Sequence, residues 1–220
     1  MKRCLQLAAL ALCILLCAGC TSRGGAGDLL PILSAGISAQ PDGSLQLTAE
    51  AVRQNSLEGD AASLYLTASG NNPDALFAGA EQLLAGKLYL SHARTVVIDA
   101  SIAEQGIGPL VRALLARSDV RLTLRLAVAR DVTADEIVRA QAVVEDIPGE
   151  ALGSLLDGHT ARGELPDLPL CRVADRILSG GDFSLPAVTL TGDGRVIPAG
   201  QADFRLARMT GFSGGDSDAG

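Results

Sequence analysis

Residues 87–129 read KLYLSHARTVVIDASIAEQGIGPLVRALLARSDVRLTLRLAVA, and this stretch decides the expected fold. The β-branched run TVVI at residues 95–98 is typical of a strand buried on both faces. The spacing Ser101-x-x-Glu104 is that of a capping box, which predicts a helix that runs to about Ser118. Residues 121–129, RLTLRLAVA, predict the next strand. This order of elements indicates an α/β arrangement in which helices cover a sheet.

Toward the N-terminus, the pattern changes to strands joined by a short turn. Residues 32–39 and 44–53 flank Gln40-Pro41-Asp42-Gly43, a combination of residue types that favours a turn, so we expect a β-hairpin. Leu45, Leu47, Ala49 and Ala51 alternate with polar residues, which predicts that one face of this hairpin is buried. Residues 62–69 alternate in the same way and predict a third strand.

A helix is expected directly after this third strand. Asn72 can cap it, Pro73 fits its first turn, and Gly86 can end it. Its apolar stripe consists of Leu76, Phe77, Ala80, Leu83 and Leu84.

Toward the C-terminus, Thr133-Ala134-Asp135-Glu136 forms a second capping box, and its acidic residues are explained by capping. We then expect a short helix from Pro148 to about Asp157, a loop over residues 159–169, a helix over 171–178, and closing strands over 186–190 and 195–206. The glycine-rich end, GFSGGDSDAG, is expected to be disordered, and the tail is set at residues 213–220. The predicted fold class is therefore α/β (α+β mixed): a mixed β-sheet flanked by helices, with a small C-terminal strand/helix extension, in one domain over residues 29–212.

The first nineteen residues have the character of a secretory signal. Lys2 and Arg3 precede about fifteen nearly uncharged residues, fewer than the roughly 20 that a spanning helix needs. Ala18 and Gly19 are small, and Cys20 follows them, which is the pattern of a lipoprotein cleavage and acylation site. We expect Cys20 to carry the lipid and residues 20–28 to form a flexible tether. An uncleaved anchor helix, or a Cys17-x-x-Cys20 redox or zinc site, are the weaker alternatives.

Charge and cysteine content bear on two further properties, nucleic-acid binding and disulfide formation. The formal net charge is −7, and loss of the two cations of the leader changes it to −9 (−7 − 2), so nucleic-acid binding is not expected. After the leader only Cys171 accompanies Cys20, so we expect a fold without an internal disulfide. Cys171 is expected to be a small buried side chain, with a reactive thiol as the alternative.

Catalytic motifs are not recognisable in this sequence. It contains His92 and His159 but no metalloprotease, nucleophile-elbow, phosphate-loop or dinucleotide pattern. We therefore expect no enzyme, no cofactor and no metal site. His92 is the one polar residue with a candidate role, either structural or functional, because it lies between an apolar segment and a buried strand.

The order of several short motifs resembles a known family. The central stretch contains Leu88-Tyr89, His92, Val96-Val97-Ile98, Gly106-Ile107, Arg117-Ser118-Asp119 and Arg121. Before it comes LPILSAGISAQPDGSLQLTAEAV from Leu30, and after it VEDIPGEAL, which ends at Leu152, and LPAVTLTGDGRVIPAGQADFRLARMTGF, which ends at Phe212. Together they resemble the N-terminal domain of the Ger(x)C lipoproteins, the C subunits of spore germinant receptors. That family has a Trp-Asp-x-Arg-Glu motif after the lipidated cysteine, where this chain has Thr21-Ser22-Arg23-Gly24-Gly25.

The resemblance implies a function. It implies a non-catalytic, lipid-anchored subunit of a nutrient receptor, on the outer face of the spore inner membrane, beside integral-membrane A and B type subunits. Its role would be assembly or signal relay during germination. Family members run to nearly twice this length, so we expect a short form without their C-terminal domain. A generic envelope lipoprotein that binds a small ligand or supports a membrane complex is the alternative.

Overall fold

The computed structural model describes residues 30–54, 61–83, 88–140 and 148–215. Their strands form one mixed sheet in the order β3-β2-β1-β5-β6-β7-β8-β9, and β4 pairs with β1 beside this path. The strands are β1 Leu30–Ala39, β2 Leu45–Gln54, β3 Ala61–Gly70, β4 Leu88–Tyr89, β5 Thr95–Asp99, β6 Arg125–Ala129, β7 Phe183–Leu190, β8 Val196–Arg205 and β9 Arg208–Ser213. The predicted α/β class with a mixed sheet is confirmed.

The sheet has a parallel centre and antiparallel flanks. β1, β5, β6 and β7 run parallel to one another, whereas β2, β3, β8 and β9 are added through antiparallel pairs. The expected hairpin is present, with Gly43 N–H donating to the Gln40 carbonyl in its turn. The C-terminal strands β7 to β9 continue the sheet beyond β6.

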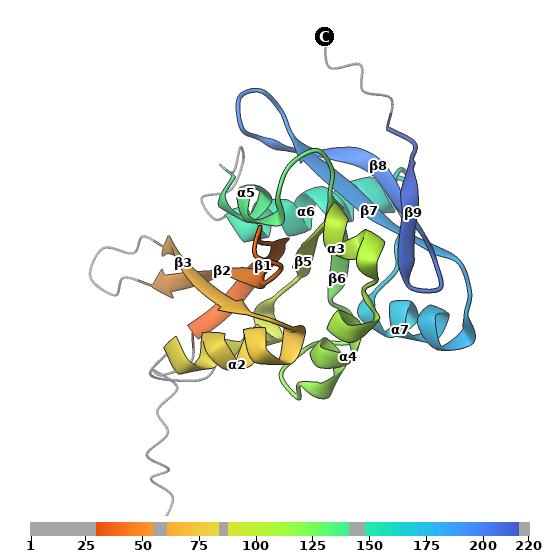
Figure 1. Ribbon diagram of the computed structural model, residues 1–220. Coiled ribbons are helices and arrows are strands. Elements are labelled where there is room, and N and C mark those ends of the chain that lie inside the picture. The colour runs from red at the N-terminus through yellow and green to blue at the C-terminus, as the bar shows by residue number, and fades with distance from the viewer. Residues whose placement is uncertain (1–29, 55–60, 84–87, 141–147, 216–220) are drawn as a thin grey trace, which may run out of the picture.

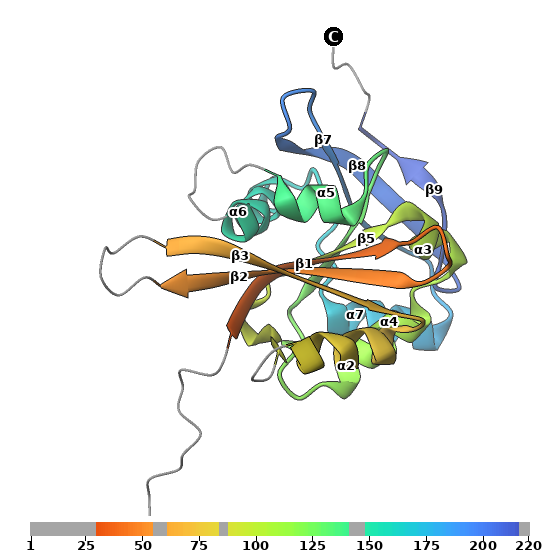
Figure 2. The same ribbon diagram turned by 60° about the vertical axis from the view of Figure 1, so that its left-hand side comes forward.

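Helices cover both faces of the sheet (Figures 1 and 2). On one side lie α2 Pro73–Leu83, α4 Gly108–Ala116 and α7 Leu170–Ser179, and on the other α5 Ala134–Arg139 and α6 Pro148–Ala161. The short helices η2 Leu90–His92 and α3 Ala100–Gln105 flank β5 at its two ends. The buried apolar residues form two clusters, a large one that includes Leu76, Leu114 and Val173 and a small one that includes Ile137 and Leu156.

The predicted helix from Ser101 to Ser118 is wrong in two respects. It is divided at Gly106, whose φ of 117° lies in a region that glycine adopts readily, into α3 and α4. The expected capping box of Ser101 and Glu104 is also wrong, because the N-cap of α3 is Asp99 and no side chain caps it. The second capping box, formed by Thr133 and Glu136, is confirmed with both of its hydrogen bonds.

Several boundaries differ from those expected from the sequence. The strand predicted from residue 121 begins at Arg125, since residues 121–124 form a turn in which Leu124 N–H donates to the Arg121 carbonyl. α6 continues to Ala161 and so includes His159, which differs from the loop expected over residues 159–169. β9 was not anticipated, and it contains Gly211 and Phe212 from the glycine-rich end. The expected helix end at Gly86 and the tail residues 216–220 lie outside the described residues.

Candidate functional site

Asp99 ends the central strand β5 and links three elements. It is 7% exposed, and its carboxylate accepts two backbone hydrogen bonds, from Ala39 N–H at the end of β1 (2.9 Å) and from Ala134 N–H at the start of α5 (2.6 Å). A buried carboxylate is stable only when such donors compensate its lost hydration. Asp99 therefore fixes α5 relative to the carboxyl ends of β1 and β5.

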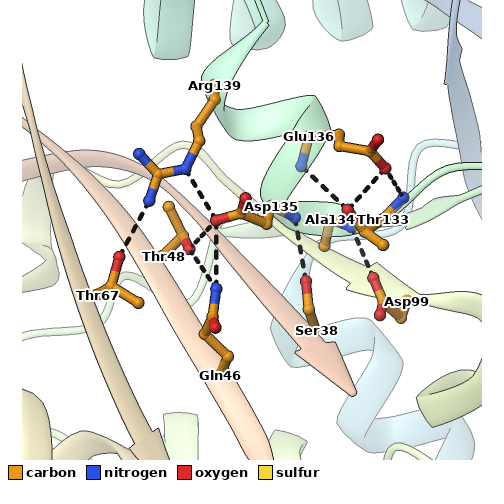
Figure 3. A network of polar contacts seen from close by, with 10 residues as sticks. All are labelled: Ser38, Gln46, Thr48, Thr67, Asp99, Thr133, Ala134, Asp135, Glu136 and Arg139. Carbon is orange, nitrogen blue, oxygen red and sulfur yellow. Dashed lines mark hydrogen bonds and ion pairs between the residues drawn. The ribbon is translucent and has the colours of Figure 1, made fainter. Parts of the chain in front are cut away.

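Asp135, in the first turn of α5, extends this network to the hairpin (Figure 3). Its Oδ1 accepts from the hydroxyl of Thr48 and from Arg139 Nε (2.9 Å), and its backbone N–H donates to Ser38 Oγ (3.1 Å). Arg139 in turn donates to Thr67 Oγ1 on β3 (3.0 Å) and lies 5.0 Å from the centre of the Tyr65 ring. The network thus connects α5 to β1, β2 and β3.

A shallow crevice of about 390 Å³ opens beside this network, at the carboxyl ends of β5 and β6. Asp99, Ser101, Asp131, Thr133 and Glu136 are among the residues that line it. Ligands of open α/β sheets bind at this end of the strands, but at a point where the strand order reverses. The parallel strands β1, β5, β6 and β7 follow one another in a single direction, so the crevice is not at such a point.

The carboxylates of this crevice are already engaged. Asp99 holds two backbone N–H groups, and Glu136 accepts from the backbone N–H and the hydroxyl of Thr133, which lowers the pKa of Glu136 below its ordinary value. Asp131 pairs with Arg130 at 3.7 Å. Within the described ranges, no group of three or more His, Cys, Asp or Glu side chains is placed to hold a metal ion. The arrangement positions helices, and the hydrogen-bonded Thr133 hydroxyl and Glu136 carboxylate serve as the cap of α5.

A second buried acid, Glu50, lies beneath the start of α6. It is 0% exposed, and its carboxylate accepts from Ser63 Oγ (2.7 Å) and Ser34 Oγ (2.9 Å). Burial raises the pKa of Glu50 above its ordinary value, although these bonds and one from Gly149 N–H oppose the change. A Cβ on Gly149 would lie only 2.4 Å from Glu50 Oε2, so glycine permits the close approach of α6.

Three of the residues that carry the family resemblance, Leu88, Arg117 and Asp119, form a structural joint at the opposite end of β5. Arg117 makes a bidentate pair with Asp119 (3.0 Å for both bonds), donates to Glu81 on α2 (2.9 Å) and donates to the Leu88 carbonyl (3.0 Å). Asp119 also accepts from Leu90 N–H (2.9 Å). Burial alone would raise the pKa of Asp119, but these donors outweigh it and the pKa is lowered. The joint ties α2, β4 and the end of α4 together.

The structure places two of the individual candidates from the sequence, His92 and Cys171, at exposed positions. His92 is exposed, and its ring lies 6.0 Å from that of Tyr89 in a tilted arrangement. The expectation that Cys171 is buried is wrong: Leu170 and Val173 face the core, and Cys171, next to Leu170 on α7, is exposed. Cys20 lies outside the described residues.

Reasoning from sequence missed Asp99, Glu50 and the partners of Arg117. The sequence does contain a signal for Asp99, because an acidic residue that directly ends a fully buried strand needs a hydrogen-bond donor. Glu50 had none, since it occupies the polar side of an alternating strand. No helix within the described residues is both long enough and apolar enough to span a bilayer.

Comparison with known proteins relates the chain to a protein family. A family model described as the N-terminal domain of a spore germination protein matches residues 27–190, which include every element from β1 to β7. No curated protein and no solved structure matches the chain.

Proposed function

We propose a function from one premise: the chain belongs to the family of spore germination protein N-terminal domains. A role in spore germination follows from this membership. Our proposal is that the protein is a lipid-anchored, non-catalytic subunit of a nutrient germinant receptor, and that it serves assembly or signal relay. The family match carries this proposal, and the engaged carboxylates around Asp99 agree with a structural rather than a catalytic role.

The proposed anchor is a lipid on Cys20. The first described strand begins at Leu30, and the nine residues between them can span at most about 30 Å. Such a connection would hold the domain close to the outer face of the spore inner membrane. Integral-membrane A and B type subunits are the proposed partners there.

Replacement of Cys20 tests the anchor. We expect Cys20→Ala to abolish incorporation of labelled palmitate and to move the protein from the membrane fraction to the soluble fraction. Cys171→Ala is the matched control, because Cys171 is exposed in the folded domain and should not affect labelling. Unchanged labelling of Cys20→Ala would refute the anchor.

Deletion of the gene tests the receptor role. We expect deletion spores to lose the response to at least one nutrient while they still germinate with a non-nutrient trigger. A normal response to every nutrient would contradict the proposal.

One observation favours the alternative of an envelope lipoprotein that binds a small ligand. A groove of about 350 Å³ lies between the hairpin turn, the start of α2 and the α3–α4 junction. Apolar residues such as Ile37, Ile102 and Leu110 line it, together with Gln40, Asn71, Asn72 and Gln105. Such a mixture of apolar surface and a few polar groups is typical of ligand sites. Normal germination of the deletion spores would favour this alternative.

A further inference from the structure

The two edges of the sheet are protected to different degrees. β9, at one edge, is six residues long, begins with Arg208, and contains an irregularity in its pairing with β8, opposite Asp203 and Phe204. Charged residues, short length and bulges are the usual devices that prevent an edge strand from pairing with another chain. β9 therefore has the features of an edge strand that is protected from pairing with another chain.

β3, at the other edge, has none of these devices. It is ten residues long, contains no charged residue and no proline, and pairs with β2 over ten consecutive positions without a register shift. Among the described elements it pairs with β2 alone, and Figures 1 and 2 show no other strand on its far side. Leu64 is 40% exposed on this strand. A long, regular and neutral edge of this kind is a template for another strand.

The sequence of β3 indicates which strand fits. Residues 63–67 read Ser-Leu-Tyr-Leu-Thr, which has the same chemical order in both directions. We propose that β3 pairs antiparallel with β3 of a second copy of this chain, about a two-fold axis at Tyr65. In this register Leu64 lies opposite Leu66 of the second copy, Ser63 lies opposite Thr67, and Tyr65 lies opposite itself. A two-fold interface uses the same patch on both copies, so a self-complementary segment satisfies it directly.

The side-chain pairs of this register are favourable ones. Leucine against leucine covers the exposed part of Leu64, and serine against threonine can form a hydroxyl hydrogen bond. Side chains directly opposite on antiparallel strands lie within about 5.5 Å of each other, so each pair is in contact. A strand of another protein that lacks this order of residues would not place leucine opposite leucine and serine opposite threonine along residues 63–67.

The charges near β3 also permit a second copy to approach. The chain carries a formal net charge of −7, so two copies repel each other over much of their surfaces. β3 itself is neutral. Arg139, beside Tyr65, is paired with Asp135 at 2.9 Å, and the carboxylate of Glu50 is enclosed by Ser34 and Ser63. These two charges, near the centre of the proposed interface, are therefore already partnered within one copy.

Disulfide trapping in the full-length, membrane-attached chain tests the proposed register. In a Cys171→Ser background, Tyr65→Cys places two cysteines opposite each other, with Cα atoms about 4.5–5.5 Å apart, which is within disulfide range. Ser63→Cys and Thr67→Cys are the matched controls on the same strand face. Each of these lies about 13 Å along the strand from its own copy, because four residues separate opposed positions.

We expect Tyr65→Cys to form a covalent dimer under mild oxidation at least about ten-fold faster than either control, because only its geometry allows the bond. The double variant Ser63→Cys/Thr67→Cys should regain the dimer, and it decides the matter if Tyr65→Cys is shown by thermal unfolding to be misfolded. Addition of Leu64→Lys should abolish trapping by placing a cation at the interface. The Cys171→Ser parent gives the background from Cys20.

Three results would overturn the proposal. Equal trapping of all single variants would indicate random collision. The absence of a dimer for both Tyr65→Cys and the double variant would show that the edge is not self-paired. A covalent product with the mass of a different partner would show that the strand of another protein occupies β3.

Discussion

The two faces of the β1–β2 hairpin are both buried, but they are built from opposite kinds of residue. The face toward α2 presents Ile37, Leu47 and Ala49, each at most 1% exposed. The face toward α5 and α6 presents polar residues that are just as inaccessible, with Ser34, Ser38, Thr48 and Glu50 at 0–3% exposed. Alternation along β2 therefore does not separate the core from solvent here.

This difference shows that the two faces of one sheet stabilise the fold in different ways. The apolar face gains free energy from burial, which is non-directional and tolerates small shifts of the covering helices. The polar face uses directional hydrogen bonds, which hold α5 and α6 in one position. Gly36 completes this face, since a Cβ there would lie 2.6 Å from the Ala134 carbonyl oxygen and would push α5 away.

The largest expected effect comes from a truncation on the apolar face. Leu47 is 0% exposed near the start of β2, so Leu47→Ala should lower the free energy of unfolding by about 2–5 kcal/mol through lost burial and a residual cavity. Urea denaturation followed by circular dichroism measures it. Leu122→Ala is the matched control, because Leu122 is 58% exposed and its truncation should change stability by less than about 0.5 kcal/mol. Equal losses of unfolding free energy in the two variants would contradict the claim that the apolar face of the hairpin stabilises the fold through burial.

The next largest effect is expected on the polar face, at Asp99. Asp99→Asn keeps the size of the side chain but replaces one acceptor oxygen with an NH₂ group, which cannot accept from Ala39 N–H or Ala134 N–H. One buried donor is then left unpaired, so we expect a loss of about 1–3 kcal/mol in the free energy of unfolding. Hydrogen exchange should show faster opening at the start of α5 than in β2.

Asp131→Asn is the control for this substitution. Asp131 lines the same crevice, but its side chain is 85% exposed, and asparagine also tolerates its φ of 62°. We expect no measurable loss of stability. A loss similar to that of Asp99→Asn would mean that the negative charge of the crevice matters, rather than the two backbone bonds of Asp99.

Much of the fold could be predicted from local patterns. The turn at Pro41-Asp42-Gly43 correctly predicted the hairpin, and the capping residues Asn72 and Thr133 correctly predicted helix starts, because these signals act within a few residues. The strand β9 could not be anticipated in the same way. Its partner β8 supplies its pairing, and its last residues, 211–213, belong to the glycine-rich end of the chain, whose composition predicts disorder.

Asp99 itself has a signal in the sequence, but its hydrogen-bond partners could not be predicted, for a different reason. Asp99 meets Ala39, sixty positions earlier in the chain, and Ala134, thirty-five positions later. Its bonds depend on sheet order and on the placement of α5, neither of which a local pattern specifies. His92 shows the converse, because its position in the sequence suggested a site, whereas the fold leaves its side chain exposed.

The smallest expected effect concerns Glu50, and it has a specific dependence on pH. Burial raises the pKa of Glu50 in the folded protein above 4.5, its ordinary value in the unfolded chain. In the pH range that begins near 4.5 and extends upward, the folded state therefore binds more protons than the unfolded state. Stability falls as pH rises through this range, and the contribution of Glu50 is most favourable below it.

Glu50→Gln removes this dependence because glutamine does not ionise. We expect the stability of the wild type, relative to Glu50→Gln, to be highest below pH 4.5 and to decrease as pH rises above it, as measured by urea denaturation at several pH values. Glu136 and Asp119, whose pKa values are lowered, act in the opposite direction but are common to both proteins and cancel in the difference. Glu104→Gln, at an exposed position on α3, is the control and should leave the profile unchanged. A difference between wild type and Glu50→Gln that is constant with pH would show that the polar face does not hold a desolvated carboxylate, and the contrast between the two faces would then reduce to hydrogen bonding alone.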